Sequence, residues 1–346
     1  MASGPIVFQH GSGKPELFGS TFKETGDFSY IKLIVAELRR NPRTTAEAMS
    51  SLCQIPSPSR DEFYRPRSVW DFLYASKNLH LISYFVKQRR KIWRDALNGA
   101  SWIILSHQNG KIMSATDKVF LLRYLLMIDS NNRGLWPFTS VLRSLEARQG
   151  PTEFETIKLA FTENLEKRGV SFGPQTVVHK LQPVLNWAAD LGLVEREKRN
   201  YRITSGGKVI AGLHEKFAES GYGAFRKEAG TKISEALPHL VLGTTEARET
   251  SERVFEESIK EGVKWIRTRI KVMRPIAIPL LRNVCCTRLL AQGNAINDLE
   301  FDNSLLQLSK RHYHKYTLML SRQSMDYPCA GIKAPRGSFY YFDLIQ

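Results

Sequence analysis

Three clusters of lysine and arginine are the residues of this sequence whose type and spacing favour a definite chemistry, the binding of phosphate groups. They span Lys87–Arg94, Arg196–Arg202 and Lys264–Arg274. Each phosphate that such a side chain neutralises releases condensed counterions, so basic clusters bind polyanions. The whole chain has 50 Lys and Arg against 34 Asp and Glu, a net charge of +16. Charge alone does not separate DNA from RNA or from a membrane surface.

Residues that could support catalysis or bind a metal are few. Asp298, Glu300 and Asp302 lie close together in the sequence. A nuclease magnesium site would also need a Glu-x-Lys strand after them, and none follows. His312 and His314 would share one face of a strand, yet no ligand set with zinc-site spacing surrounds them. No complete Walker loop and no Gly-x-Ser-x-Gly elbow is present. We therefore predict no catalytic residues, no metal site and no cofactor.

Cysteine use and hydropathy favour a reducing compartment. The chain has four cysteines and no CxxC pair, so neither a disulfide scaffold nor a zinc ribbon is predicted. Cys285 and Cys286 fall within an apolar helical pattern and are expected to be buried thiols. No run approaches about 18 apolar residues, and residues 1–28 lack the apolar core of a signal peptide. We expect a cytoplasmic protein without a membrane partner.

Apolar periodicity predicts a mainly helical chain. The first helix follows a loose arm and ends before Pro42, because the residue before proline avoids the helical region. The run Trp102–Leu105 is predicted to be a strand, followed by a turn at Gln108–Lys111. The helices expected in the first half of the chain are 28–40, 44–52, 68–76, 117–128, 138–148 and 152–167.

The segment 174–212 is the most informative part of the sequence. A short helix is predicted over Pro174–Leu181, and Pro183 suits the first turn of another helix that reaches Asp190. Gly192 is placed to end that helix in a left-handed conformation. A charged turn, a strand at Tyr201–Thr204 and a further helix from Val209 follow.

This segment resembles the ending of winged-helix DNA-binding domains, which have three helices followed by a two-stranded hairpin, the wing. The resemblance rests on Leu191-Gly192-Leu193-Val194-Glu195, the basic turn Arg196–Asn200, Tyr201-Arg202-Ile203-Thr204 and Gly207-Lys208. The glycine turns the chain out of the helix, short strands cover its apolar face, and the wing tip carries charge that can meet a phosphate.

Two further copies of this pattern are predicted. The first has the helices 28–40, 44–52 and 68–76, with a wing at Trp102–Ser106 and Gly110–Ile112. The other has the helices 276–291 and 299–308, followed by strands at 316–320 and 338–345. Under this interpretation Lys87–Arg94 is a wing or loop that grips phosphates, with Trp93 stacked on a base or sugar. The alternative is a solvated helix face that Trp93 anchors to the core.

The sequence thus predicts a mainly α fold with small antiparallel β wings, in tandem winged-helix domains. The resemblance implies a non-enzymatic protein that binds double-stranded DNA, as a regulator or as the recognition subunit of a bacterial antiviral defence or restriction-like complex with other protein subunits. The alternatives are a protein–protein adaptor and, third, a nuclease without a recognisable motif. The predicted parts are an arm (1–27), a winged-helix-like module (28–112), a helical linker (113–170), a winged-helix core (171–212) and a helical region ending in a winged-helix-like module (213–346). The predicted DNA-binding residues are Arg65, Arg67, Lys87, Arg89, Arg90, Lys91, Lys180, Gln182, Asn186, Arg196, Lys198, Arg199, Arg202 and Lys208.

Overall fold

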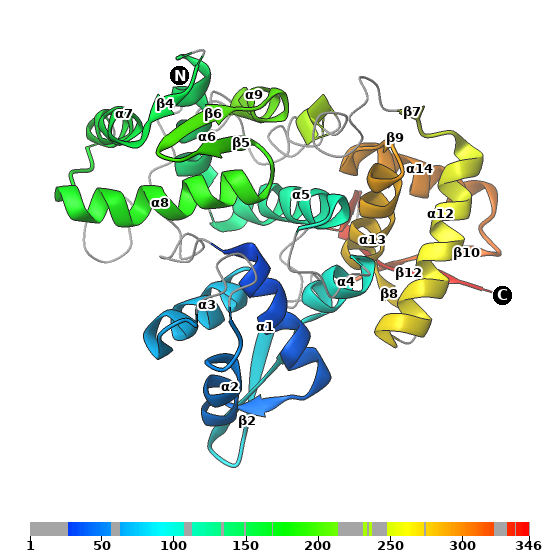
Figure 1. Ribbon diagram of the computed structural model, residues 1–346. Coiled ribbons are helices and arrows are strands. Elements are labelled where there is room, and N and C mark those ends of the chain that lie inside the picture. Colours follow the sequence, from blue (N-terminus) through cyan, green and yellow to red (C-terminus); the bar gives the residue numbers. More distant parts are fainter. Residues whose placement is uncertain are drawn as a thin grey trace.

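The chain is mainly helical, with small sheets that are antiparallel except for one two-stranded parallel pair (Figure 1). The prediction of a mainly α protein with small antiparallel sheets is confirmed at this level. No helix among the described residues is both long and apolar enough to cross a membrane. This computed structural model describes residues 27–56, 63–106, 113–132, 135–148, 150–167, 169–213, 231–233, 235–236, 248–272, 275–321, 331–335 and 337–345.

A first unit, residues 28–95, contains three helices and a three-stranded antiparallel sheet in the order β1-β3-β2. Asp27 caps the first helix, because its side chain accepts the backbone N–H of Tyr30. Thr44 and Glu47 form a capping box that starts the second helix. The elements are α1 (Phe28–Arg40), β1 (Arg43–Thr44), α2 (Thr45–Leu52), α3 (Pro66–Asn78), β2 (Ile82–Lys87) and β3 (Arg90–Asp95).

A second unit, residues 135–203, repeats this order of helices and strands, and its sheet order β4-β6-β5 corresponds to β1-β3-β2. A left-handed residue ends the third helix in both units, His80 (φ 53) in the first and Gly192 (φ 74) in the second. The elements are α6 (Leu135–Glu146), β4 (Thr152–Glu153), α7 (Phe154–Glu166), α8 (Pro174–Asp190), β5 (Val194–Glu197) and β6 (Asn200–Ile203); α9 (Ser205–Ala211) follows.

A third unit, residues 252–344, has the same order again, because β8 precedes its second helix and pairs with β12, which also pairs with β10. Its additions are β11 (Ile332–Ala334) beside β12, and β9 (Asn294–Ala295), which pairs with β7 (Arg248–Glu249). The elements are α12 (Glu252–Trp265), the π-helix η2 (Ile266–Ile270), β8 (Ile276–Ala277), α13 (Ile278–Ala291), α14 (Asp298–Arg311), β10 (Tyr316–Leu320) and β12 (Gly337–Leu344).

Two helices between the first and second units, α4 (Leu97–Leu105) and α5 (Ala115–Asn132), lie at the centre of the molecule (Figure 1). Asp117 of α5 is buried and accepts hydrogen bonds from Lys32 Nζ (2.8 Å) and Trp102 Nε1 (2.7 Å), which ties α1, α4 and α5 together. Arg123 of α5 is also buried and donates to Asp298 Oδ1 (2.8 Å) of α14. The two central helices therefore connect the units through paired, buried charges.

Two predictions about individual elements are wrong. Residues Trp102–Leu105 belong to α4, so the predicted first wing at that position does not exist, and residues 107–112 lie outside the described residues. Pro183 lies inside the continuous helix α8 and does not begin a second helix. The predicted linker 113–170 contains α6 and α7, which pack against α8, so a boundary at residue 171 would divide the second unit.

Candidate nucleic-acid interface

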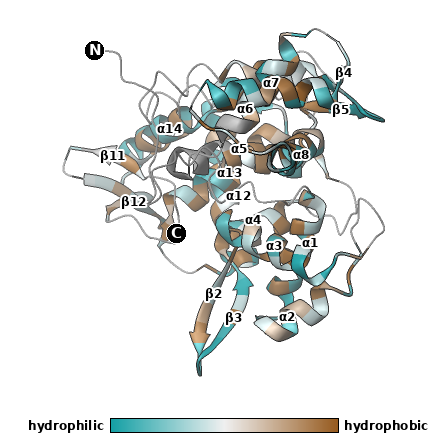
Figure 2. Cartoon of the chain, turned by 90° about the vertical axis from the view of Figure 1, so that its left-hand side faces the viewer, coloured by the Kyte–Doolittle hydropathy of each residue, from teal (hydrophilic) through white to brown (hydrophobic). Residues whose placement is uncertain are grey.

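The hairpin β2–β3 of the first unit projects away from the rest of the chain (Figures 1 and 2). Lys87 pairs with Arg90 across the ladder, so Gln88 and Arg89 form a two-residue turn. Both have left-handed backbones, with φ of 50° and 61°. This geometry matches the twist of a tight hairpin, but it usually takes Asn and Gly. Because Gln88 and Arg89 are neither Asn nor Gly, the backbone of the turn is strained at both residues.

The hairpin presents a concentration of exposed positive charge. Within the described part of the chain, none of its lysines and arginines forms an ion pair with a carboxylate. The hairpin's own acid, Asp95, lies at its base and pairs with Arg39 of α1 at 3.1 Å. Burial raises the pKa of Asp95, and the Arg39 cation acts against that rise. The exposed cations are Lys87, Arg89, Arg90, Lys91 and Arg94.

Aromatic side chains fix the hairpin against α3. The ring of Tyr84 lies 5.1 Å from that of Trp93, and Trp93 lies 5.8 Å from Tyr74 of α3. Two cations cover the Tyr84 ring, Lys91 at 4.8 Å and Lys77 of α3 at 5.4 Å. Such contacts are favourable because the ring face is negative. They bring Lys77, a residue that sequence reasoning missed, beside the hairpin.

The structure corrects one part of each of the two interpretations of Lys87–Arg94. The segment is a strand and turn, so the alternative is wrong about the helix, whereas its prediction that Trp93 anchors the segment to the core is confirmed. Trp93 is fully buried and its indole N–H donates to Thr45 Oγ1 at 3.0 Å, so it cannot stack on a base as predicted. Its role is to anchor the hairpin to α2 and α3.

Arg65 and Arg67 lie at the beginning of α3, Arg65 at the N-cap and Arg67 in the first turn, and both are exposed. With a rise of about 1.5 Å per residue, Arg67 lies about 15 Å along the helix from Lys77. The first unit thus brings together the four predicted hairpin residues, and it places the other two predicted residues at the far end of α3.

In the second unit the hairpin β5–β6 carries less unpaired charge. Arg202 forms a salt bridge with Glu195 at 2.6 Å, and Arg196 lies over the ring of Tyr201 at 5.7 Å. Lys198 and Arg199 form the exposed tip between Glu197 and Asn200. The glutamates offset part of the positive charge, so this hairpin attracts phosphates less than β2–β3 does.

The predicted base-reading residues of α8 do not lie on an exposed face. Gln182 and Asn186 are half-buried, and Gln182 Nε2 donates to Asn186 Oδ1 (2.9 Å) and to the hydroxyl of Tyr201 (3.3 Å). The prediction that they are exposed is wrong. Their spacing of four residues places both side chains on one face of α8, and the hydrogen bond to Tyr201 shows that this face lies against β6. Lys180 is half-buried, whereas Lys208 is exposed on α9.

Two carboxylates and two thiols with the chemistry for catalysis or metal binding are buried in the fold. Asp298 and Asp302 form buried ion pairs with Arg123 (2.8 Å) and Arg282 (2.6 Å). Cys285 and Cys286 are buried free thiols, as predicted, and burial raises the pKa of Cys285 to about 12. Among the described residues, no three His, Cys, Asp or Glu side chains gather where a metal could bind, and Cys329 lies outside that part of the chain.

Protein-family models, curated proteins and solved structures give no match to this chain. A functional proposal therefore depends on the chain's own residues and their arrangement. That arrangement is a hairpin with five exposed cations, packed against a helix that begins with two more. Such a surface can bind several phosphates of one polyanion at the same time.

Proposed function

We propose that this protein binds double-stranded DNA and contains three winged-helix units, residues 28–95, 135–203 and 252–344. The support is the order helix-strand-helix-helix-strand-strand, present three times with the same sheet order. In winged-helix domains the third helix enters the major groove and the hairpin is the wing. The corresponding elements are α3 with β2–β3, α8 with β5–β6, and α14 with β10–β12.

The first unit is the principal DNA contact in this proposal. The observation that carries it is the exposed, unpaired charge of β2–β3 beside α3, described above. Arg67 on the exposed start of α3 is the candidate for base reading, because a guanidinium can make two hydrogen bonds to a guanine edge. The hairpin cations would supply affinity through backbone phosphates, which carry no sequence information.

The test compares two matched sets of four substitutions. One replaces Lys87, Arg89, Arg90 and Lys91 by Gln, and the other replaces Arg196, Lys198, Arg199 and Arg202 by Gln. Binding of fluorescent duplex DNA is measured by anisotropy across a salt series. Each lost phosphate contact lowers the log–log salt slope by about 0.9, so the first set should lower it by about 3 to 4 and the second by less.

An unchanged slope in the first variant would contradict the principal contact that we propose. Absence of any duplex binding at low salt would contradict DNA binding as a whole. The second candidate function, an adaptor that holds partner proteins, would then gain support from the exposed apolar residues Phe85 (40%) and Val86 (64%) of the same hairpin. A DNA-recognition subunit or a regulator would use partner proteins as well.

A further inference from the structure

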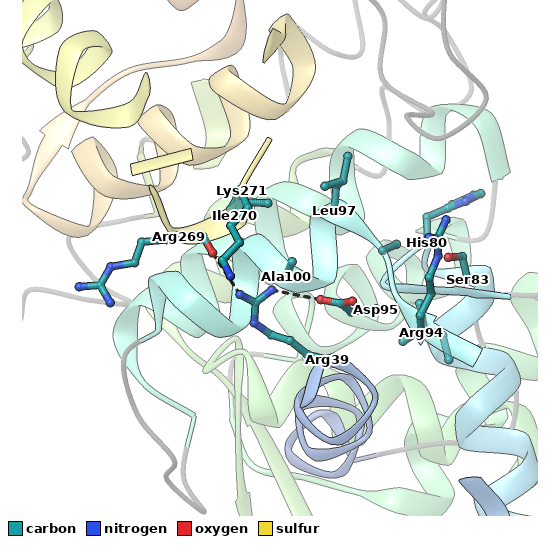
Figure 3. Close-up of a pocket in the computed structure, with 12 residues that line it drawn as sticks. Arg39, His80, Ser83, Arg94, Asp95, Leu97, Ala100, Arg269, Ile270 and Lys271 are labelled. Atoms are coloured by element: carbon teal, nitrogen blue, oxygen red, sulfur yellow. Dashed lines mark hydrogen bonds and ion pairs between the residues drawn. The ribbon is translucent and has the colours of Figure 1, made fainter. Parts of the chain in front are cut away.

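A polar pocket of about 570 Å³ lies between the first and third units (Figure 3). Its wall includes α1, the base of β2–β3, the start of α4 and the end of the π-helix η2. These segments are far apart in the sequence, since the hydrogen bond from Arg39 to Arg269 O spans 230 residues. The volume is within the range of small-ligand sites and is too small for a duplex to enter.

The charge of this pocket is positive. Arg39 reaches both sides, donating to Asp95 Oδ2 (3.1 Å) and to the backbone carbonyl of Arg269 (3.2 Å). Arg94 and Lys271 also line the pocket, and neither forms an ion pair with a carboxylate in the described part of the chain. Arg269 contributes its carbonyl, because its side chain points away from the other labelled residues (Figure 3). Three cations and one carboxylate thus line the pocket.

The backbone at Lys271 is unusual. Five residues of π-helix precede it, and Lys271 itself is left-handed with φ of 61°. Single π-turns occur often at functional sites, and a non-glycine residue with positive φ persists only where its surroundings hold it. Here this conformation places Lys271 at the pocket, opposite Arg94 of the first unit.

We propose that this pocket binds a small phosphorylated ligand of mononucleotide size. The phosphates would lie between Arg94 and Lys271, with Arg39 held in place by Asp95, since guanidinium and ammonium groups are the usual phosphate ligands. The uncharged part of the ligand would pack on the apolar side of the pocket, which Leu97, Ala100 and Ile270 form. The volume exceeds the need of inorganic phosphate alone, which favours a ligand with a base or sugar.

Such a ligand would hold the first and third units together. It would bridge β3 of the first unit to the end of η2 in the third, and β3 also carries the exposed cations Arg90 and Lys91. The pocket residues themselves are outside the hairpin tip. This inference does not depend on DNA binding, and it is tested without DNA.

The experiment is isothermal titration calorimetry of the full chain with AMP, ADP, ATP and inorganic phosphate, at low salt and without DNA. We expect binding that tightens as phosphates are added and is weakest for inorganic phosphate. The double variant Arg94→Gln/Lys271→Gln should bind at least about tenfold more weakly, because two charged hydrogen bonds are lost. The matched control Arg40→Gln/Lys264→Gln removes one exposed cation from each side and leaves the pocket-lining residues intact.

A third variant keeps the test decisive if the double variant fails to fold. Asp95→Asn removes the negative charge and retains a hydrogen-bond acceptor for Arg39, so it should bind the nucleotides several-fold more tightly. No binding by the wild type, equal losses in the double variant and its control, or weaker binding by Asp95→Asn would each overturn the proposal. If Arg94→Gln/Lys271→Gln weakens duplex binding while no nucleotide binds, the cations contact DNA and the pocket is not a ligand site.

Discussion

The left-handed arginine at the tip of β2–β3 combines strain with exposure. Arg89 has φ of 61°, a conformation that costs a non-glycine residue about 1–2 kcal/mol. Replacement by glycine removes this cost, so we expect Arg89→Gly to raise the free energy of unfolding by about 1 kcal/mol. The same change should lower the salt slope of DNA binding by about one, since one phosphate contact is lost. Urea denaturation and anisotropy measure the two effects.

Lys198 provides the matched control, because it is left-handed (φ 56°) at the tip of the less basic hairpin β5–β6. Lys198→Gly should stabilise the fold by a similar amount and change DNA binding less than Arg89→Gly does. A stabilised Arg89→Gly variant with wild-type DNA affinity would show that Arg89 does not contact the duplex.

His80 has a left-handed backbone and a titratable side chain, so it can make the stability of the fold depend on pH. Burial lowers its pKa, and the neighbouring Lys77 lowers it further, so the folded protein favours the neutral ring. The unfolded chain takes up a proton near pH 6.5, so the contribution of His80 to stability is present above that pH and is lost as the pH falls below it. His80→Asn keeps a residue that tolerates positive φ and does not titrate.

We therefore expect the free energy of unfolding to fall less between pH 7 and pH 5 in His80→Asn than in the wild type. Parallel urea titrations at the two pH values measure the difference. Equal losses in both proteins would mean that other groups set the pH dependence.

At the scale of elements, helices with strong end signals could be predicted from the sequence. α1 ends at Arg40, just before Asn41-Pro42, and α14 lies where Asn297 and Glu300 form a capping box. The hairpin β5–β6 was also predictable, because Gly192 marks the end of the preceding helix. The first hairpin was predicted only as a wing or loop, with a helix face as the alternative, since its turn Gln88-Arg89 contains neither Asn nor Gly.

The apolar run Trp102–Leu105 explains the other error, because a short buried helix and a buried strand have the same hydropathy. A signal for the correct position did exist: Leu79-His80-Leu81-Ile82 parallels Leu191-Gly192-Leu193-Val194. The cations of the candidate DNA contact on β2–β3 could be predicted from the sequence, since they are contiguous in it. Lys77 and the pocket could not, because tertiary packing alone brings their residues together.

A pair of glycines marks the same close contact in α4 and α9, the helices that directly follow the first and second units. A Cβ atom on Gly99 would lie 2.0 Å from Leu81 O, and one on Gly207 would lie 2.1 Å from Leu193 O. Backbone cannot move away cheaply, so Gly99→Ala and Gly207→Ala should each lower the free energy of unfolding by about 2 kcal/mol or more. Gly150→Ala, whose nearest neighbour is at 3.9 Å, is the control and should be close to neutral.

Chemical denaturation of the three glycine variants measures these effects. Equal stability of all three would contradict the packing of the chain after each hairpin against the loop before it. A loss at only one of the two positions would show that the first and second units differ where the structure makes them alike.

At the scale of the whole molecule, Arg123 connects the central helix α5 to the third unit. Its guanidinium donates to Asp298 (2.8 Å) on α14 and to Asn283 Oδ1 (3.0 Å) and Thr287 Oγ1 (3.2 Å) on α13. The pair is buried, so removal of the cation takes a 2.8 Å ion-pair contact from a buried carboxylate, which keeps a longer contact of 3.9 Å to Arg282. We expect Arg123→Met to lower the free energy of unfolding by about 3 kcal/mol.

Two companions make this last prediction specific. Arg123→Met/Asp298→Asn also removes the negative charge of Asp298 and should recover part of the loss, since a neutral amide costs less to bury than a carboxylate. Arg288→Met breaks a more exposed pair with Glu261 and should change stability by less than about 1 kcal/mol. Urea denaturation of the three variants measures this order. If Arg123→Met is no less stable than Arg288→Met, buried charge does not hold the third unit on α5, and the apolar contact between α5 and α13 is sufficient.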